Sequence, residues 1–178
     1  GGALKERKGF DIVIRAFDIV RKKIPDALYI IVGAGSEVAA LRALITQLRL
    51  EDAVQLAGSI SESELPSYFA LCDVYCHTPR ALAGAFEGFG IVYLEAGAAG
   101  KPVIGSRSGG VSDAIVDGVT GLLVPEENVN ATAAAIIQLL SNQEQANRFG
   151  KTGQQFAKEH RWEAIAEKYL AIYRSVSV

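Results

Sequence analysis

The chain has 178 residues, of which 49% are hydrophobic and 21% charged, and its formal net charge is −2. This size and composition predict a soluble globular core of one domain rather than a disordered tail. The acidic balance argues against nucleic acid as a partner, because phosphate backbones require a basic protein face. No apolar run approaches the roughly 20 residues that span a bilayer, so no transmembrane segment is predicted.

The first residues read as the end of a strand rather than as a natural beginning. Gly1–Leu4 are small or apolar, and the sequence contains no Met. We therefore expect residues 1–178 to form one domain of a longer protein, preceded by an N-terminal domain that this chain lacks.

A helix is predicted after this strand end. Its apolar residues recur at helical spacing, at Phe10, Val13, Ile14, Phe17 and Val20. The basic run 21–23 lies in the expected last turn, where cations favour the helix dipole, and Pro25 follows as a stop. The apolar run Ala27–Val32 then closes at Gly33, which is typical of a strand covered on both faces.

Helices and strands continue to alternate along the chain. Ser36 is expected to cap a helix that ends near Arg49, and Ser61-x-x-Glu64 is a capping box for a helix that ends near Leu71. Further strands are predicted at Ala53–Ala57, Asp73–Cys76, Pro102–Gly105 and Gly121–Val124.

Three helices are predicted after the last strand. Asn128 or Asn130 caps the first, which ends near Leu140, and the others lie near 142–158 and 161–176. No strand separates them, so this tail either packs on the sheet edge or reaches toward a neighbouring domain. The alternation before it predicts a three-layer α/β/α, Rossmann-like domain with a parallel sheet of about six strands, counting the strand end at residues 1–4.

Ligands of open parallel sheets bind beyond the carboxyl ends of the strands. The predicted loops at those ends are 5–9, 33–36, 58–61, 77–90 and 105–113. These loops hold most of the unusual chemistry in the chain, including cations, a histidine and many glycines. Glycine allows backbone to approach a ligand closely or to take a positive φ.

The segment Glu87–Glu95 says most about function. A carboxylate leads into a glycine-flanked turn that is expected to open a helix over residues 90–99, and Glu95 follows after seven intervening residues. No Ser, Thr, Asp or Asn precedes the helix start as an obvious cap. An anion such as phosphate would satisfy the free N–H groups there, and hydroxyl groups suit the two acids. A nucleotide sugar meets all three demands.

The remaining sulfur and carboxylate residues do not indicate a metal site. Cys72 and Cys76 are interpreted as buried thiols, since together with His77 they offer only three ligands at no fitting spacing. No Asp-x-Asp triplet occurs, so no metal clamp on a diphosphate and no cofactor is predicted.

Several segments together resemble the family 4 retaining glycosyltransferases. The strongest is Glu87–Glu95, which is similar to the two-glutamate motif of that family. The others, in family order, are Gly2-x-Leu4-x-x-Arg7-Lys8-Gly9, Val32-Gly33-x-Gly35, Leu56-Ala57-Gly58, Gly97–Ile104, Gly109-Gly110 and Asp117-Gly118-x-x-Gly121–Val124. The residues near 162–173 resemble the closing helices of the family, so the resemblance covers essentially the whole chain.

The resemblance implies the C-terminal, donor-binding half of a two-domain GT-B enzyme. By that resemblance Glu95 accepts hydrogen bonds from the ribose hydroxyls, and Glu87 holds hydroxyls of the transferred sugar. Lys8 pairs with the phosphates and is the second residue, beside Glu87, to which a catalytic role is assigned. The backbone of Gly88, Phe89, Gly90, Ile91 and Val92 faces the sugar and diphosphate, and Gly33, Ser59 and Ile60 lie toward the nucleotide.

Five residues keep two interpretations. Many family members have Arg where this chain has Ala3, and Arg7 either supplies that charge or points away from the ligand. Gly109 and Gly110 serve either a turn or a ligand. His77 is interpreted as structural or as a sugar contact. Arg80 is either a surface charge or a phosphate contact.

The function predicted from these residues is transfer of a hexose from a nucleoside diphosphate sugar to an acceptor hydroxyl. Frequency within the family suggests UDP-glucose as donor, with a glycan or lipid acceptor bound by the N-terminal domain. The expected location is the cytoplasm or, peripherally, the inner membrane face. A noncatalytic module that binds nucleotide sugars and a nonhydrolysing sugar-nucleotide epimerase are the alternatives.

Overall fold

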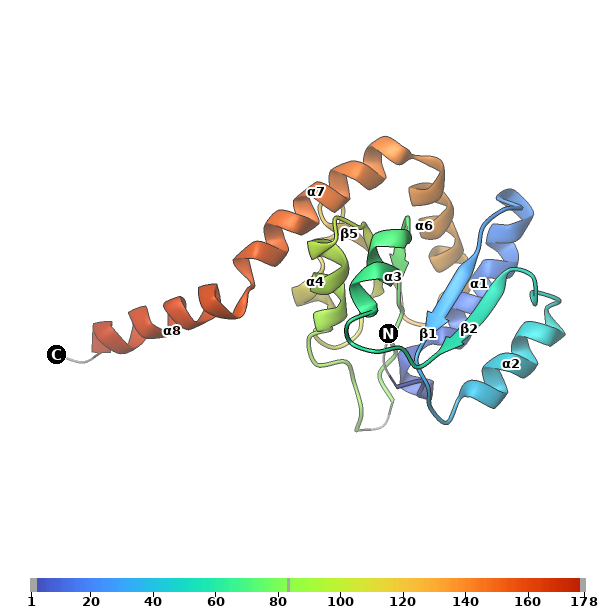
Figure 1. The fold of residues 1–178 in the computed structure, drawn as a ribbon, viewed down its shortest axis with the longest axis horizontal. Coiled ribbons are helices and arrows are strands. Elements are labelled where there is room, and N and C mark those ends of the chain that lie inside the picture. Colours follow the sequence, from blue (N-terminus) through green and yellow to red (C-terminus); the bar gives the residue numbers. More distant parts are fainter. Residues whose placement is uncertain (1–2, 83, 177–178) are drawn as a thin grey trace.

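A computed structural model describes residues 3–82 and 84–176 as an α/β body from which the last helix projects (Figure 1). The strands are β1 (Tyr29–Val32), β2 (Val54–Gly58), β3 (Tyr75–Cys76), β4 (Val103–Ser106) and β5 (Gly121–Val124). The helices are α1 (Phe10–Lys23), α2 (Val38–Gln47), α3 (Leu65–Leu71), α4 (Ile91–Ala98), α5 (Val111–Ala114), α6 (Val129–Ser141), α7 (Gln143–Glu159) and α8 (Trp162–Val176). A single 3-10 turn, η1, covers Glu6–Lys8.

All strand pairs are parallel, as predicted, but the strands form two sheets. β1 pairs with β2, and β3, β4 and β5 pair in that order. The described residues therefore contain five strands rather than about six. Of the predicted first strand, Gly1 and Gly2 lie outside the described residues, and Ala3 and Leu4 are not in a strand. Leu4 still lies beside the end of β1, since its N–H donates to the Ala34 carbonyl at 2.8 Å.

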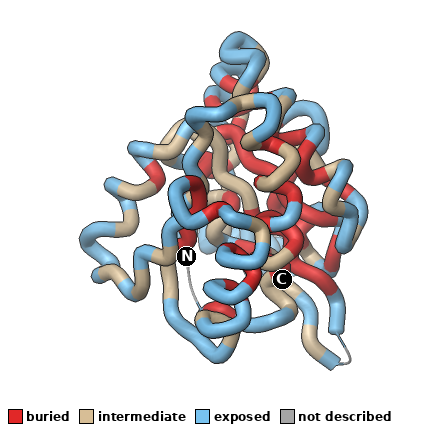
Figure 2. Tube along the Cα trace, turned by 90° about the vertical axis from the view of Figure 1, so that its right-hand side faces the viewer, coloured by how far each residue is buried: buried red, intermediate tan, exposed pale blue. Residues whose placement is uncertain are grey.

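Strand β4 shows why the domain has three layers. Consecutive strand residues face opposite sides of a sheet. Val103 packs into a cluster with residues of α3, α4 and α5, whereas Ile104 packs into a cluster with α1, α2 and α6. All four residues of β4 are buried, and buried positions gather in the interior of the body (Figure 2). The predicted α/β/α arrangement is confirmed around this strand.

The prediction that residues 27–32 are covered on both faces is wrong for β1. Ile31 is 1% exposed and packs against the helices, but Ile30 is 43% exposed and Leu28 49%. The cluster formed by α3, α4 and α5 contains no residue of β1 or β2. An apolar run thus predicts a strand, but it does not predict whether helices cover one face of that strand or both.

Helix ends follow the sequence only in part. Asn128 caps α6 as predicted, because its side chain accepts from the Ala131 N–H at 2.9 Å. Ser36 does not cap α2, which starts after Glu37 without a side-chain cap. Half of the predicted capping box forms, because the Glu64 carboxylate accepts from the Ser61 N–H at 2.8 Å. The Ser61 hydroxyl donates to that carboxylate at 2.6 Å, the Glu64 N–H donates to the Ser61 carbonyl, and α3 begins only at Leu65.

The two closing helices are present as predicted, and α8 projects from the body (Figure 1). None of its residues is buried, and its exposed side chains include Trp162 at 76% and Tyr169 at 59%. None of the helices in the described part of the chain combines the length and apolar character needed to span a bilayer.

Candidate functional site

The loops after the strands meet at one edge of the body, as the parallel topology requires. Four backbone hydrogen bonds link these loops in series. Each joins an N–H of one loop to a carbonyl oxygen of another: Leu4 to Ala34, Gly33 to Gly58 and Arg80 to Arg7, all at 2.8 Å, and Gly110 to Glu87 at 3.0 Å. Segments separated by up to 73 residues of sequence, from Arg7 to Arg80, are therefore neighbours here. This edge contains Arg7, Lys8 and Glu87, and α4, which carries Glu95, begins just after it.

The start of α4 has the predicted form. Gly90 precedes the helix with φ of 81°, a left-handed conformation that glycine adopts without strain, and no side chain caps the helix. The first N–H groups of such a helix have no partner inside it, and they carry the positive end of its dipole. A Cβ at Gly90 would lie 2.6 Å from the buried ring of Tyr93, so packing also requires glycine.

The two predicted phosphate cations reach the same carboxylate. Lys8 Nζ donates to Glu87 Oε2 at 2.7 Å, and Arg7 Nη1 donates to that oxygen at 3.1 Å. Their side chains are only 16% and 27% exposed, and that of Glu87 is 13% exposed. Strand-like alternation would have pointed Arg7 and Lys8 apart. They instead form the 3-10 turn η1, which ends at Gly9, and both side chains reach Glu87.

Gly109 and Gly110, which the sequence left open, support the Glu87 turn. A Cβ at Gly109 would lie 2.3 Å from the Glu87 carbonyl oxygen, and one at Gly110 would lie 1.7 Å from that of Gly88. No larger residue fits at either position without moving this backbone. By contrast, a Cβ at Gly88 would meet no atom within 4 Å, so its outer side is open.

Glu95 lies on the exposed side of α4. Its sequence neighbours Ile91, Val92 and Leu94 are apolar and suggest a buried position, where an unpaired carboxylate would be costly. Glu95 is nevertheless exposed, as is Ile91 one turn before it at 55%. The apolar residues of α4 turn inward instead, with Tyr93 1% exposed. An exposed carboxylate carries no desolvation cost, so burial gives no evidence for a ligand at Glu95.

The other predicted contact residues spread along the same edge. Phe89 and Val92 are partly buried against the cluster that contains Tyr93. Ser59 is exposed and Ile60 half-buried, directly after β2. Gly33 has a φ of 137°, and its N–H donates to the Gly58 carbonyl at 2.8 Å. The loops of Gly33, Ser59 and Ile60 are connected to Glu87 through the series of backbone hydrogen bonds described above.

His77 is a core residue. It is 3% exposed, and its ring is stacked between Phe10 at 5.4 Å and Tyr93 at 5.9 Å. Neither ring nitrogen has a hydrogen-bond partner among the described residues. Burial, reinforced by the nearby charge of Lys8, lowers the pKa of His77 to about 3, so the imidazole is neutral. The alternative of a sugar contact is not supported by this burial.

Arg80 joins the loop before Glu87 to two other elements. Its guanidinium pairs with Asp11 on α1 and, at 2.8 Å, with Glu127 before α6, and its side chain is only 10% exposed. It is therefore neither a surface charge nor free to contact phosphate. The sequence separations of 69 and 47 residues explain why no local pattern identified these partners.

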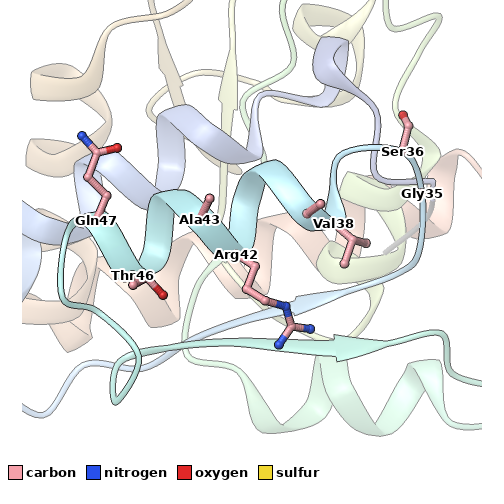
Figure 3. A pocket seen from close by; sticks show the side chains of 8 residues that line it. Gly35, Ser36, Val38, Arg42, Ala43, Thr46 and Gln47 are labelled. Atoms are coloured by element: carbon pink, nitrogen blue, oxygen red, sulfur yellow. The ribbon is translucent and has the colours of Figure 1, made fainter.

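A surface hollow of about 880 Å³ runs along α2 and the end of the strand-end loop 33–36 that leads into it (Figure 3). It is lined by Gly35, Ser36, Val38, Ala39, Arg42, Ala43, Thr46 and Gln47. Gly35 and Ser36 belong to the strand-end loop 33–36, but none of these residues was assigned a contact with the donor. The candidate site is instead the strand-end surface around Glu87, because Lys8, Arg7 and Glu87 meet there beside the uncapped start of α4.

Cys72 and Cys76 are free thiols, but both are half-buried rather than buried as the sequence predicted. Desolvation raises the pKa of Cys76 to about 12. Among residues 3–82 and 84–176, no group of three or more His, Cys, Asp or Glu side chains is arranged to hold a metal ion.

The fold and the site define a Rossmann-like α/β domain of the kind that forms one half of GT-B enzymes. The family model of glycosyl transferases group 1 matches residues 2–156. The GDP-mannose-dependent alpha-(1-6)-phosphatidylinositol monomannoside mannosyltransferase of Mycobacterium tuberculosis is 36% identical over 96% of this chain and 45% of its own length. The crystal structure of HepE of Anabaena with UDP-glucose has a TM-score of 0.82 and 27% identity, covering 99% of this chain and 48% of that one.

The pneumococcal O-GlcNAc transferase GtfA, in complex with UDP and GlcNAc, has the same TM-score of 0.82 with 28% identity, over 98% of this chain and 35% of that one. The chain belongs to the glycosyl transferases group 1, and both the family resemblance and the GT-B fold predicted from the sequence are confirmed. It spans about 45% of the length of the mycobacterial mannosyltransferase.

Proposed function

We propose that this chain is the donor-binding half of a retaining glycosyltransferase that moves a hexose from a nucleoside diphosphate sugar to an acceptor hydroxyl. The observation that carries the proposal is the meeting of Lys8, Arg7 and Glu87 beside the uncapped start of α4. Cations and helix N–H groups suit a diphosphate, and carboxylates suit sugar hydroxyls.

Each group has one role in this proposal. The N–H groups around Gly90 and Val92, with Lys8 and Arg7, hold the diphosphate. Glu87 accepts hydrogen bonds from hydroxyls of the transferred sugar. Glu95, exposed on α4, accepts them from the ribose, and the backbone near Ser59 faces the base. Two or three charge-assisted hydrogen bonds at these acids would fix the orientation of the donor.

The chemical difficulty is departure of the diphosphate while the anomeric carbon gains positive charge. Lys8, Arg7 and the start of α4 stabilise the negative charge that grows on the leaving phosphate. Preorganised donors of this sort are typically worth roughly 3–4 kcal/mol each at the barrier. The family resemblance implies retention of anomeric configuration, and we assign no nucleophile in this chain.

The donor that the relatives support best is GDP-mannose. The mycobacterial relative at 36% identity is named as GDP-mannose-dependent, whereas HepE with UDP-glucose and GtfA with UDP share 27% and 28% identity. We therefore place GDP-mannose ahead of the UDP-glucose that frequency within the family suggested. The acceptor, a glycan or a lipid, would bind to an N-terminal domain outside this chain, so the chain alone should bind donor but transfer sugar poorly.

Calorimetry with GDP-mannose, UDP-glucose, GDP and UDP tests the proposal. We expect GDP-mannose to bind most tightly. Glu95→Ala should lower the affinity for all four compounds by about 10- to 100-fold, the size expected when hydrogen bonds to a charged group are lost. Glu51→Ala is the matched control, because Glu51 is exposed before β2, at the opposite end of the strands. If Glu95→Ala and Glu51→Ala bind all four compounds equally, the assigned site is wrong.

Turnover by the whole protein separates the transferase from the other two functions. Transfer of mannose or glucose to an acceptor supports the proposal. Donor binding without turnover would indicate a noncatalytic module, and isomerisation of the sugar nucleotide would indicate an epimerase.

A further inference from the structure

We propose that Glu87 competes with the donor diphosphate for Lys8 and Arg7, so that the site favours nucleotides that carry a sugar over the free nucleoside diphosphate. This inference rests on the proposed function and adds a specificity role to a residue assigned there only to sugar hydroxyls. It begins from the ion pairs at Glu87, which join the groups assigned to sugar and to phosphate.

Both cations use the same oxygen of Glu87. Lys8 Nζ lies 2.7 Å and Arg7 Nη1 3.1 Å from Oε2, and all three side chains are less than one-third exposed. Partial burial weakens screening by water, so these pairs are stronger than pairs on an open surface. A phosphate that approaches the Lys8 ammonium and the Arg7 guanidinium also meets the negative charge of Glu87.

The backbone at Glu87 cannot move away easily. Its carbonyl oxygen accepts from the Gly110 N–H at 3.0 Å, and Gly109 packs against it so closely that no Cβ fits between them. Arg7 also donates to the Phe86 carbonyl at 3.3 Å, which holds the turn against η1. The carboxylate is therefore the part that moves: it leaves the cations by rotating its own side chain.

The consequence depends on whether a sugar is attached. An intact donor supplies hydroxyl groups from which the released Glu87 carboxylate can accept hydrogen bonds. A free nucleoside diphosphate has hydroxyl groups only on its ribose, which the proposed function assigns to Glu95, and none on a transferred sugar. Its phosphates therefore gain the cations while the partly buried Glu87 carboxylate loses its partners. Glu87 thus weakens binding of the product more than binding of the substrate, which favours release of the nucleoside diphosphate after transfer.

Calorimetry on the 178-residue chain with GDP, UDP, GDP-mannose and UDP-glucose tests this inference. We expect Glu87→Gln to bind GDP or UDP roughly five- to tenfold more tightly, the size of two partly shielded ion pairs. The same substitution should leave binding of the sugar nucleotide unchanged or weaken it. Glu6→Gln is the matched control, since Glu6 is exposed in η1 and its replacement changes net charge equally.

A double-substitution cycle separates competition for the cations from a general effect of charge. In the Arg7→Ala/Lys8→Ala background, Glu87→Gln should no longer tighten binding of GDP or UDP, because no cation remains that Glu87 could withhold from the phosphates. If wild type binds nucleotide but Glu87→Gln matches Glu6→Gln, or if the tightening persists without the two cations, the inference is overturned while the proposed function stands. If no variant and no wild-type chain binds any of the four nucleotides, both fail.

Discussion

Replacing Arg80 with alanine removes a buried cation that joins three parts of the chain. Arg80 Nη1 lies 2.8 Å from Glu127, Nη2 contacts Asp11, and the side chain is 10% exposed. The two acids are more accessible, at 33% for Asp11 and 58% for Glu127, so water can solvate them once the guanidinium is gone. The substitution therefore tests a network whose cation is buried and whose anions are not.

The expected loss of stability lies between two known limits. Breaking a fully buried ion pair costs about 3–5 kcal/mol, and exposed pairs contribute about 0.2–1 kcal/mol. Because Asp11 and Glu127 keep access to water, we expect a loss of about 2 kcal/mol in the free energy of unfolding. For a chain of this size that corresponds to a fall of roughly 4–8 °C in Tm.

Urea unfolding of Arg80→Ala measures this loss, with Arg107→Ala as control. Arg107 also pairs with an acid, Asp117, but its side chain is 54% exposed, so its removal should cost less than about 1 kcal/mol. The backbone N–H of residue 80 still reaches the Arg7 carbonyl, so affinity for GDP should fall less than in Lys8→Ala. Equal stability of the two arginine variants would refute the reasoning, as would a loss of GDP binding by Arg80→Ala without a loss of stability.

Two further predictions follow from local geometry and burial. Gly90→Ala should lose at least about 1–2 kcal/mol of stability, because Gly90 has a positive φ and an added Cβ would clash with Tyr93. Gly88→Ala is the control and should unfold like wild type, since a Cβ there meets no atom within 4 Å. Equal urea midpoints for the two variants would contradict this prediction. His77 keeps a folded pKa of about 3 against an ordinary value of 6.5, so the unfolded chain takes up its proton first, and stability should fall as pH drops from about 6.5 toward 3. His77→Phe should flatten that acid-side loss in unfolding experiments, and an unchanged pH profile would exclude the histidine as its cause.

Local sequence patterns correctly predicted the helices and strands that have regular apolar spacing or glycine and proline at their ends. Phe10 to Val20 repeat at helical spacing over two to three turns, and α1 covers Phe10–Lys23. Gly121–Val124 is bounded by glycine and Pro125, and β5 has those bounds. The segment Glu87–Glu95 carried its own evidence for an uncapped helix start, because capping depends on side chains within a few residues.

Burial and partner choice could not be read from neighbours in sequence. The apolar residues around Glu95 suggested that it is buried, but the helix turns them inward and leaves the carboxylate exposed. Ser36 has the chemistry of a cap, but α2 starts after Glu37 without a side-chain cap, and the Glu37 N–H donates to the distant Leu4 carbonyl at 3.2 Å. In both cases the tertiary arrangement decided the outcome.

The sequence alone therefore determined the α/β class, the order of helices and parallel strands, and the residues that gather at the carboxyl ends of the strands. Short-range steric and hydrogen-bond preferences govern those features. Only the tertiary structure decided that Lys8 and Arg7 share one oxygen of Glu87, and that Gly109 and Gly110 hold its backbone. Those contacts join segments about 20 to 80 residues apart, and chain folding, rather than local preference, sets which of them come within reach of one another.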